Sequence, residues 1–253
     1  TRSDRDWSSD VCSSDLYCDF SGYSDIAIGC SRLFGINLMR NFAYPYFSRD
    51  IAEFWRRWHI SLSTWFRDYL YIPLGGSRGS KLQSVRNTFI IFLTSGFWHG
   101  ANWTFLVWGF IHALCFLPLL IFGRNRKYID DVAKKSAWPH PKEILQIGLT
   151  FLIVMVAWVF FRAPNLATAC AWLKTMLLLE NSSQMHGLGL SSFPKILLFV
   201  CLLMSVEWRN RFWKHGLQRI SNHRWIRYVI YIVFCIAIIM FRGGQQKFIY
   251  FQF

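Results

Sequence analysis

The sequence predicts an all-α polytopic membrane protein, from its composition, its runs of apolar residues and the placement of its basic residues. Of the 253 residues, 53% are hydrophobic and only 17% are charged, whereas an average soluble chain is about 25% charged. The 28 Lys and Arg residues, against 14 Asp and Glu, concentrate between the apolar runs. Basic segments in this arrangement are typical of membrane proteins and argue against a nucleic-acid partner. We therefore expect contact with the lipid bilayer and no nucleic acid.

Four apolar segments reach, or nearly reach, the about 20 residues that cross a bilayer as a helix. They are residues 102–122, 144–161, 194–208 and 225–241. Loops 123–143 and 209–224 are rich in Lys and Arg and segment 162–193 is not, so the positive-inside rule places the two loops in the cytoplasm and the segment outside. The apolar stretch 166–179 is too short to cross and predicts a surface or re-entrant helix.

The first half of the chain carries helices that suit protein or water more than lipid. Residues 49–72 place Trp and other apolar side chains at alternating three- and four-residue steps, which predicts one amphipathic helix that ends at Pro73. The apolar run 88–98 is about half a bilayer long, which predicts a short helix cut by Gly100. Short or broken helices at membrane depth occur where protein or water surrounds them. This region is therefore where we look for a functional site.

The N-terminal end and the cysteines carry no chemistry in this interpretation. Residues 1–15 are polar and contain Ser-Ser-Asp twice, unlike the aromatic sequence that begins at Tyr17. We interpret them as a non-native leader, with a natural polar loop as the alternative. The seven cysteines are far apart and form no C-x-x-C motif, so we expect neither disulfides nor a metal site.

Two histidines are candidates for catalysis. His99 lies in the segment SGFWHGAN, where apolar neighbours predict burial and small residues leave room for a substrate. A desolvated imidazole stays neutral and can accept a proton from a hydroxyl group, although a packing histidine is the alternative. His59 shares a helix flank with Ser63 at helical spacing, and a structural role is its more common alternative. His112, in the middle of an apolar segment, predicts a hydrogen bond between helices.

Several motifs in this order resemble the membrane-bound O-acyltransferase family. They are YCDFSGYSD at 17–25, FWRRWHISLS at 54–63, YIPLGG at 71–76 and FWHGA at 97–101. They are most similar to its bacterial branch of alginate O-acetyltransferases and teichoic acid D-alanyl transfer proteins, and WVFFRAP at 158–164 resembles the alginate type. The resemblance implies a ring of helices around a central tunnel. Residues 16–253 would form the C-terminal part of that single domain, and the N-terminal part of the same protein would complete it.

The resemblance also implies a reaction and a site. By motif, His99 matches the family's catalytic histidine and His59 its second active-site position. Trp98, Asn102 and Ser63 are expected to bind the substrate. The implied donor is a cytoplasmic acyl thioester, acetyl-CoA as co-substrate, with no bound cofactor and no metal. The implied acceptor is an extracytoplasmic polysaccharide, reached with periplasmic acetyl-transfer proteins from a multi-pass position in the bacterial inner membrane.

Two functions of other classes stay open at this point. Polar helices that line a permeation path would make the protein a transporter or channel, although such a protein usually has a deeper acidic residue. A catalytically silent family member could instead scaffold an exopolysaccharide export complex, although both Trp-His motifs are retained. Alginate, cellulose, teichoic acid and other polymers are equally compatible acceptors.

Overall fold

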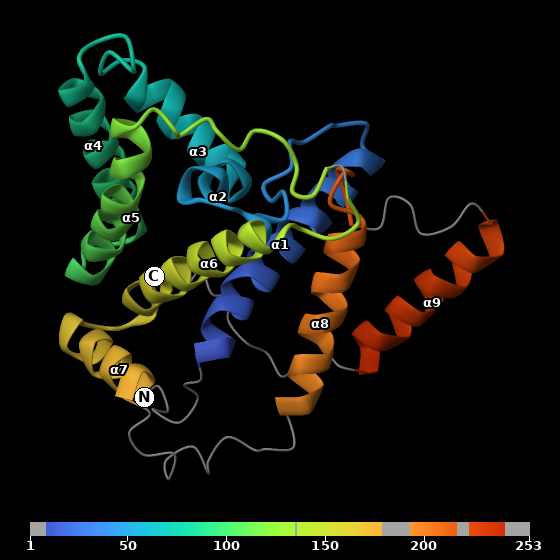
Figure 1. Ribbon diagram of the computed structural model, residues 1–253. Coiled ribbons are helices and arrows are strands. Elements are labelled where there is room, and N and C mark those ends of the chain that lie inside the picture. The colour runs from blue at the N-terminus through green and yellow to red at the C-terminus, as the bar shows by residue number, and fades with distance from the viewer. Residues whose placement is uncertain (1–8, 135, 179–192, 217–222, 241–253) are drawn as a thin grey trace.

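In the computed structural model, which describes residues 9–134, 136–178, 193–216 and 223–240, every regular element is a helix (Figure 1). The predicted all-α class is therefore confirmed for the described residues. The elements are α1 (Ser9–Leu33), a 3-10 turn (Pro45–Phe47), α2 (Ile51–Arg57), α3 (Ile60–Phe66), a π turn (Arg67–Tyr71), α4 (Lys81–His99), α5 (Trp103–Ile121), α6 (Pro141–Arg162), α7 (Leu166–Leu178), α8 (Phe193–Arg209) and α9 (Arg224–Met240).

Helices α5 and α6 are long and apolar enough to cross a membrane, as predicted for 102–122 and 144–161. The observed α6 begins slightly earlier than predicted, at Pro141, because a proline at the first helical position leaves no backbone N–H unpaired. Helices α8 and α9 fall on the other two predicted segments with 17 residues each, and their crossing of the bilayer stays a prediction. Helix α7 occupies the predicted short segment at 166–179.

The single helix predicted for residues 49–72 is wrong, because the chain breaks after α2. Trp58 is extended, and His59 has a left-handed backbone with φ 41° and ψ 57°. Asn41 stabilises the break from a distant loop. Its carbonyl accepts from the Ile60 N–H at 3.0 Å, and its Oδ1 accepts from the Ser61 N–H at 3.1 Å. These bonds give partners to the first backbone N–H groups of α3, which a continuous helix would have paired with the preceding turn. The spacing of apolar residues along 49–72 cannot reveal them, because Asn41 lies outside that segment.

The short helix predicted for 88–98 is also wrong, because α4 runs without a break from Lys81 to His99. Ser80 caps its start by accepting a hydrogen bond from the Gln83 N–H at 3.2 Å. The first turns are largely polar, and three of their polar residues, Ser84, Asn87 and Thr88, are buried. Asn87 is fully buried and donates to the carbonyl groups of Leu74 and Gly76 at 3.1 and 3.2 Å. Hydropathy underestimated the length of α4, because buried polar side chains such as Asn87 find their hydrogen-bond partners outside the helix.

Helices α4 and α5 lie side by side (Figure 1), and two glycines let them pack closely. A Cβ atom at Gly96 would overlap the backbone oxygen of Phe105, and one at Gly109 would overlap that of Phe92. Glycine lets the two backbones approach at these points, as small residues do in membrane helix pairs. The resulting hairpin holds His99, the last residue of α4, beside the first turns of α5.

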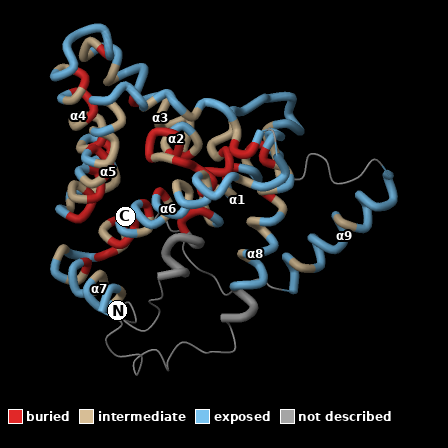
Figure 2. The backbone as a smooth tube through the Cα atoms, in the orientation of Figure 1, coloured by how far each residue is buried: buried red, intermediate tan, exposed pale blue. Residues whose placement is uncertain are grey.

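Buried residues gather where α2, α5 and α6 meet, and α1 covers part of this core (Figure 2). Large side chains with less than 2% exposure include Phe54, Trp108 and Phe161. The Tyr17 hydroxyl on α1 donates to Glu207 Oε1 on α8 at 2.5 Å, which joins these two helices through a buried hydrogen bond. The aromatic core therefore lies next to the break at His59.

A buried group of charges joins α2 to the start of α6. Glu53 is 1% exposed and lies 3.0 Å from the Arg49 guanidinium and 2.8 Å from that of Arg57. Arg49 also pairs with Glu143 of α6 at 3.0 Å and donates to the Asp130 carbonyl. Buried charges are stable only when they are paired in this way. This network fixes α2 against α6 and the loop that precedes it.

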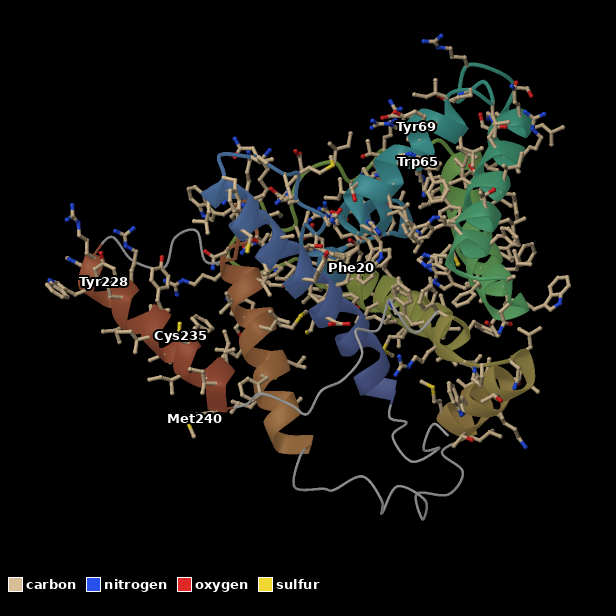
Figure 3. The ribbon with its side chains drawn as sticks, turned by 180° about the vertical axis from the view of Figure 1, so that it is seen from behind. Phe20, Trp65, Tyr69, Tyr228, Cys235 and Met240 are labelled. Carbon is tan, nitrogen blue, oxygen red and sulfur yellow. The ribbon has the colours of Figure 1, made fainter. Side chains whose placement is uncertain are left out.

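Helix α9 lies at the edge of the molecule and has no buried residue (Figures 1 and 2). Tyr228, Cys235 and Met240 project from it into open space (Figure 3). A helix that is apolar on all sides suits lipid or other membrane helices more than water.

Candidate active site

His59 and His99 line the same cavity, although 39 intervening residues separate them in the sequence. The other lining residues are Trp55, Trp58, Leu62, Ser95, Trp108, Trp158 and Phe161. The cavity has about 10 Å³ of space, which is room for one water-sized group. The break between α2 and α3 and the end of α4 thus bring two imidazoles to one small aromatic chamber.

Aromatic rings from α5 and α6 enclose His99. Its ring centroid lies 5.4 Å from that of Trp108, with the two planes at 88°, and 4.9 Å from that of Phe161. Trp98 contacts the imidazole from the preceding position at 4.8 Å. These contacts use the ends of α5 and α6 that meet α4, so the cavity lies toward one end of the two candidate spans.

His59 reaches the cavity from a strained backbone conformation. A left-handed backbone is uncommon for a residue other than Gly, Asn or Asp, and it occurs frequently at functional sites. The His59 ring packs edge-on against Phe20 of α1, with ring centroids 4.6 Å apart, and its Nδ1 lies 3.4 Å from the Ser61 hydroxyl. Without the break, a continuous helix would carry His59 in a different direction.

Burial keeps both imidazoles neutral. It lowers the pKa of His59 to about 4 by removing water from the charged form. Burial also lowers the pKa of His99 to about 3, and repulsion from the nearby His59 adds to this shift. Each ring therefore keeps a lone pair at neutral pH, which a general base needs.

The three residues expected to bind substrate do not line the cavity. Trp98 is 56% exposed and flanks His99 without lining the cavity. Asn102 caps α5, accepting from the Thr104 N–H at 3.1 Å and donating to the Pro164 carbonyl at 2.9 Å. The Ser63 hydroxyl donates to the Trp58 carbonyl at 3.3 Å. Asn102 and Ser63 thus hold local structure, and the binding role of all three stays a prediction.

The sequence did not single out the tryptophans that form most of the chamber. Trp108 and Trp158 lie on the apolar helices α5 and α6, where tryptophan is expected to mark the membrane–water interface. The one available signal is spacing, because Trp108 and His112 are one turn apart and so share a face of α5. His112 accepts a hydrogen bond from the Trp55 Nε1–H at 3.4 Å, which confirms the predicted link between helices. The described residues contain no group of three or more His, Cys, Asp or Glu able to hold a metal ion.

Comparison with known proteins agrees with the motifs. The family model described as MBOAT, membrane-bound O-acyltransferase family, matches residues 13–136. The probable alginate O-acetylase AlgI of Azotobacter vinelandii is 51% identical over 154 residues, which are 61% of this chain and 29% of the relative. The peptidoglycan O-acetyltransferase of Helicobacter pylori is 46% identical over 171 residues, which are 68% of this chain and 31% of the relative.

A more distant relative is the teichoic acid D-alanyltransferase of Streptococcus thermophilus, 37% identical over 159 residues, which are 58% of this chain and 38% of the relative. The chain spans between 29% and 38% of the length of these three curated relatives. The family match includes both cavity histidines, His59 and His99. Residues 13–136 thus carry the membrane-bound O-acyltransferase family domain.

Proposed function

We propose that the protein containing this chain transfers an acetyl group from a cytoplasmic thioester to hydroxyl groups of an extracytoplasmic polysaccharide. The observation that carries the proposal is that both family histidines, His59 and His99, line one aromatic cavity. A neutral, desolvated imidazole beside an enclosed space is the arrangement that acyl transfer to a hydroxyl requires. Enclosure also keeps bulk water from hydrolysing the thioester.

In this reaction His99 accepts the proton of the acceptor hydroxyl as its oxygen attacks the acyl carbon. The leaving thiolate then takes that proton from the imidazolium, so the histidine returns to its starting state. His59 lines the same cavity and orients the acyl group or stabilises developing charge. Residues in the rest of the protein would complete a ring of helices around a tunnel that joins the two membrane faces.

The relatives favour acetyl as the transferred group and alginate or a similar polymer as the acceptor. Two of the three are named O-acetylating enzymes, and the third, a D-alanyltransferase, is less similar to this chain. Acetyl-CoA would serve as co-substrate, and periplasmic acetyl-transfer proteins would carry the group to the polymer. The apolar helices α5 and α6, with α8 and α9, would hold the protein in the bacterial inner membrane as a multi-pass protein.

Replacing His99 by Ala in the full-length protein tests this function. Polymer acetylation at matched membrane levels should fall to background, because no other imidazole in the cavity occupies the same position. The matched control is His215→Ala, a histidine outside the cavity that contacts Arg32 at 3.0 Å. Normal acetylation by the His99→Ala variant would contradict the catalytic assignment, and substrate flux across proteoliposomes without acyl chemistry would favour a transporter.

A further inference from the structure

We propose that the indole N–H of Trp108 donates a hydrogen bond to the carbonyl oxygen of the acyl group that reacts beside His99. Trp108 would thus be a further catalytic residue, one that touches the reacting atoms. This inference rests on the proposed acyl transfer, and it names the group that stabilises the negative charge formed in that reaction.

The first observation is an unused donor in the cavity wall. Trp108 is 1% exposed, and its Nε1 has no hydrogen-bond partner among the described residues. Buried polar groups almost always have a partner, so an exception requires a reason. Leaving a buried N–H unpaired destabilises the folded state, because its bonds to water are lost and not replaced. A carbonyl group bound during turnover would give this donor a partner.

The second observation is the position of this donor relative to the two histidines. Trp108 and His99 line the same cavity, and their rings meet edge to face at 5.4 Å. Trp55 lines the cavity as well, but its N–H already donates to His112 at 3.4 Å. The indole of Trp108 is held in place by Trp158 and Phe161, whose ring centroids lie 6.0 and 5.3 Å away. It is therefore a rigid donor that needs little reorganisation to meet an oxyanion.

The chemistry of the step requires such a donor. The acceptor oxygen forms a bond to the acyl carbon while His99 takes the hydroxyl proton, and one electron pair of the C=O bond moves onto the oxygen. The Trp108 N–H stabilises the negative charge at that oxygen. The carbonyl then forms again, the C–S bond breaks, and the thiolate leaves with its electron pair and takes the proton from His99. The products are an ester and a thiol.

A tryptophan-to-phenylalanine exchange isolates the N–H from the aromatic ring. In the full-length protein, Trp108→Phe should lower kcat for acetyl transfer about 100-fold, the usual effect of losing one oxyanion donor, with KM for acetyl-CoA within about threefold of wild type. Its unfolding temperature should fall only by the packing that the smaller ring loses, because the lost N–H had no partner among the described residues. The matched control is Trp103→Phe, on the same helix but 72% exposed and outside the cavity lining. It should retain wild-type kcat.

A spectroscopic measurement separates hydrogen bonding from packing. With carbonyl-labelled acetyl-CoA bound to the His99→Ala variant, which cannot turn over, the infrared stretch of the acetyl C=O group should lie lower than in the double variant His99→Ala, Trp108→Phe. Wild-type kcat for Trp108→Phe, or equal stretching frequencies in the two variants, would overturn the assignment of Trp108. Retention of acetyl transfer by His99→Ala alone would instead overturn the proposed function, so the two failures are distinguishable.

Discussion

The indole N–H of Trp55 donates a hydrogen bond to Nδ1 of His112 over 3.4 Å, and this bond joins α2 to the middle of α5. The two rings meet almost at right angles, with centroids 5.0 Å apart, and His112 is fully buried. The other ring nitrogen, Nε2, has no partner among the described residues. One indole therefore satisfies one of the two ring nitrogens of a histidine within an apolar helix.

Replacing Trp55 by Phe should destabilise the protein by removing a hydrogen bond as well as part of the ring, whereas the same exchange at Trp108 removes ring packing alone. The variant would leave a buried ring nitrogen of His112 without its donor, which is unfavourable by about 1 kcal/mol or more. Thermal unfolding of the full-length protein in detergent, compared with Trp103→Phe, measures the difference. Equal unfolding temperatures for the Trp55 and Trp103 variants would show that the bond contributes nothing.

Glu53→Gln should be among the most destabilising exchanges in this chain. Glu53 is 1% exposed and pairs with both Arg49 and Arg57, so its neutralisation removes the buried carboxylate that the two cations share. Arg49 keeps only Glu143, and Arg57 keeps only the more exposed Asp131 at 3.5 Å. Breaking a buried ion pair from one side typically reduces the free energy of unfolding by about 3–5 kcal/mol. The control is Asp68→Asn, which removes the exposed pair with Arg67 and should leave the unfolding temperature unchanged. Similar losses in both variants would contradict this prediction.

The left-handed backbone at His59 predicts that a Gly variant is more stable than an Ala variant, the reverse of the usual order. With φ at 41°, an L residue is strained there and glycine is not. His59→Gly should therefore unfold with a free energy about 0.5–1 kcal/mol higher than His59→Ala, although both lack the imidazole. Chemical denaturation of the two variants measures this difference. A more stable Ala variant would mean that the chain does not break at this position.

The two half-buried imidazoles of the cavity, His59 and His99, should make the folded protein sensitive to acid. Burial lowers the pKa of His59 to about 4 and that of His99 to about 3, whereas an unfolded chain has the ordinary pKa of about 6.5. The unfolded state therefore binds more protons below about pH 6.5, and the stability contributed by these groups is full above that pH and is lost as the pH falls toward the folded values.

Unfolding temperatures between pH 4 and pH 8 check this dependence. A double variant, His59→Gln with His99→Gln, should lose less stability in acid than the wild type, because it lacks two groups that protonate on unfolding. Subtracting the unfolding temperatures of the two proteins at each pH removes the contribution of all other titratable groups, because both proteins share them. Parallel curves for the two proteins would contradict the burial of the imidazoles.

The sequence predicted those elements whose signals are local. Residues 102–122 and 144–161 were found because apolar composition alone defines them, and Asn102 and Pro141 mark the helix starts. The break at His59 was missed because it depends on Asn41, 18 residues away, whose carbonyl and side chain cap α3. The polar half of α4 was missed for the same reason, because Asn87 finds its partners in the turn after the π helix.

The candidate site divides in the same way. The Trp-His motifs singled out His59 and His99, and the structure places them at one cavity. Their shared environment depends on Trp108, Trp158 and Phe161, whose contacts form only when α4, α5 and α6 pack together. The unpaired N–H of Trp108 is visible only after every neighbour is in place, because no sequence pattern records the absence of a partner.

The glycine contact between α4 and α5 affects the geometry of the cavity, although neither glycine lines the cavity. A slip of α5 by one residue would move it by about 1.5 Å along its axis and turn it by about 100°. Gly96 and Gly109 would then leave their opposing carbonyls, and side chains with a Cβ would take their places. The two glycine contacts therefore fix the register of α5 against α4. That register, set a turn away from the imidazole, fixes how far His99 stands from the indole of Trp108.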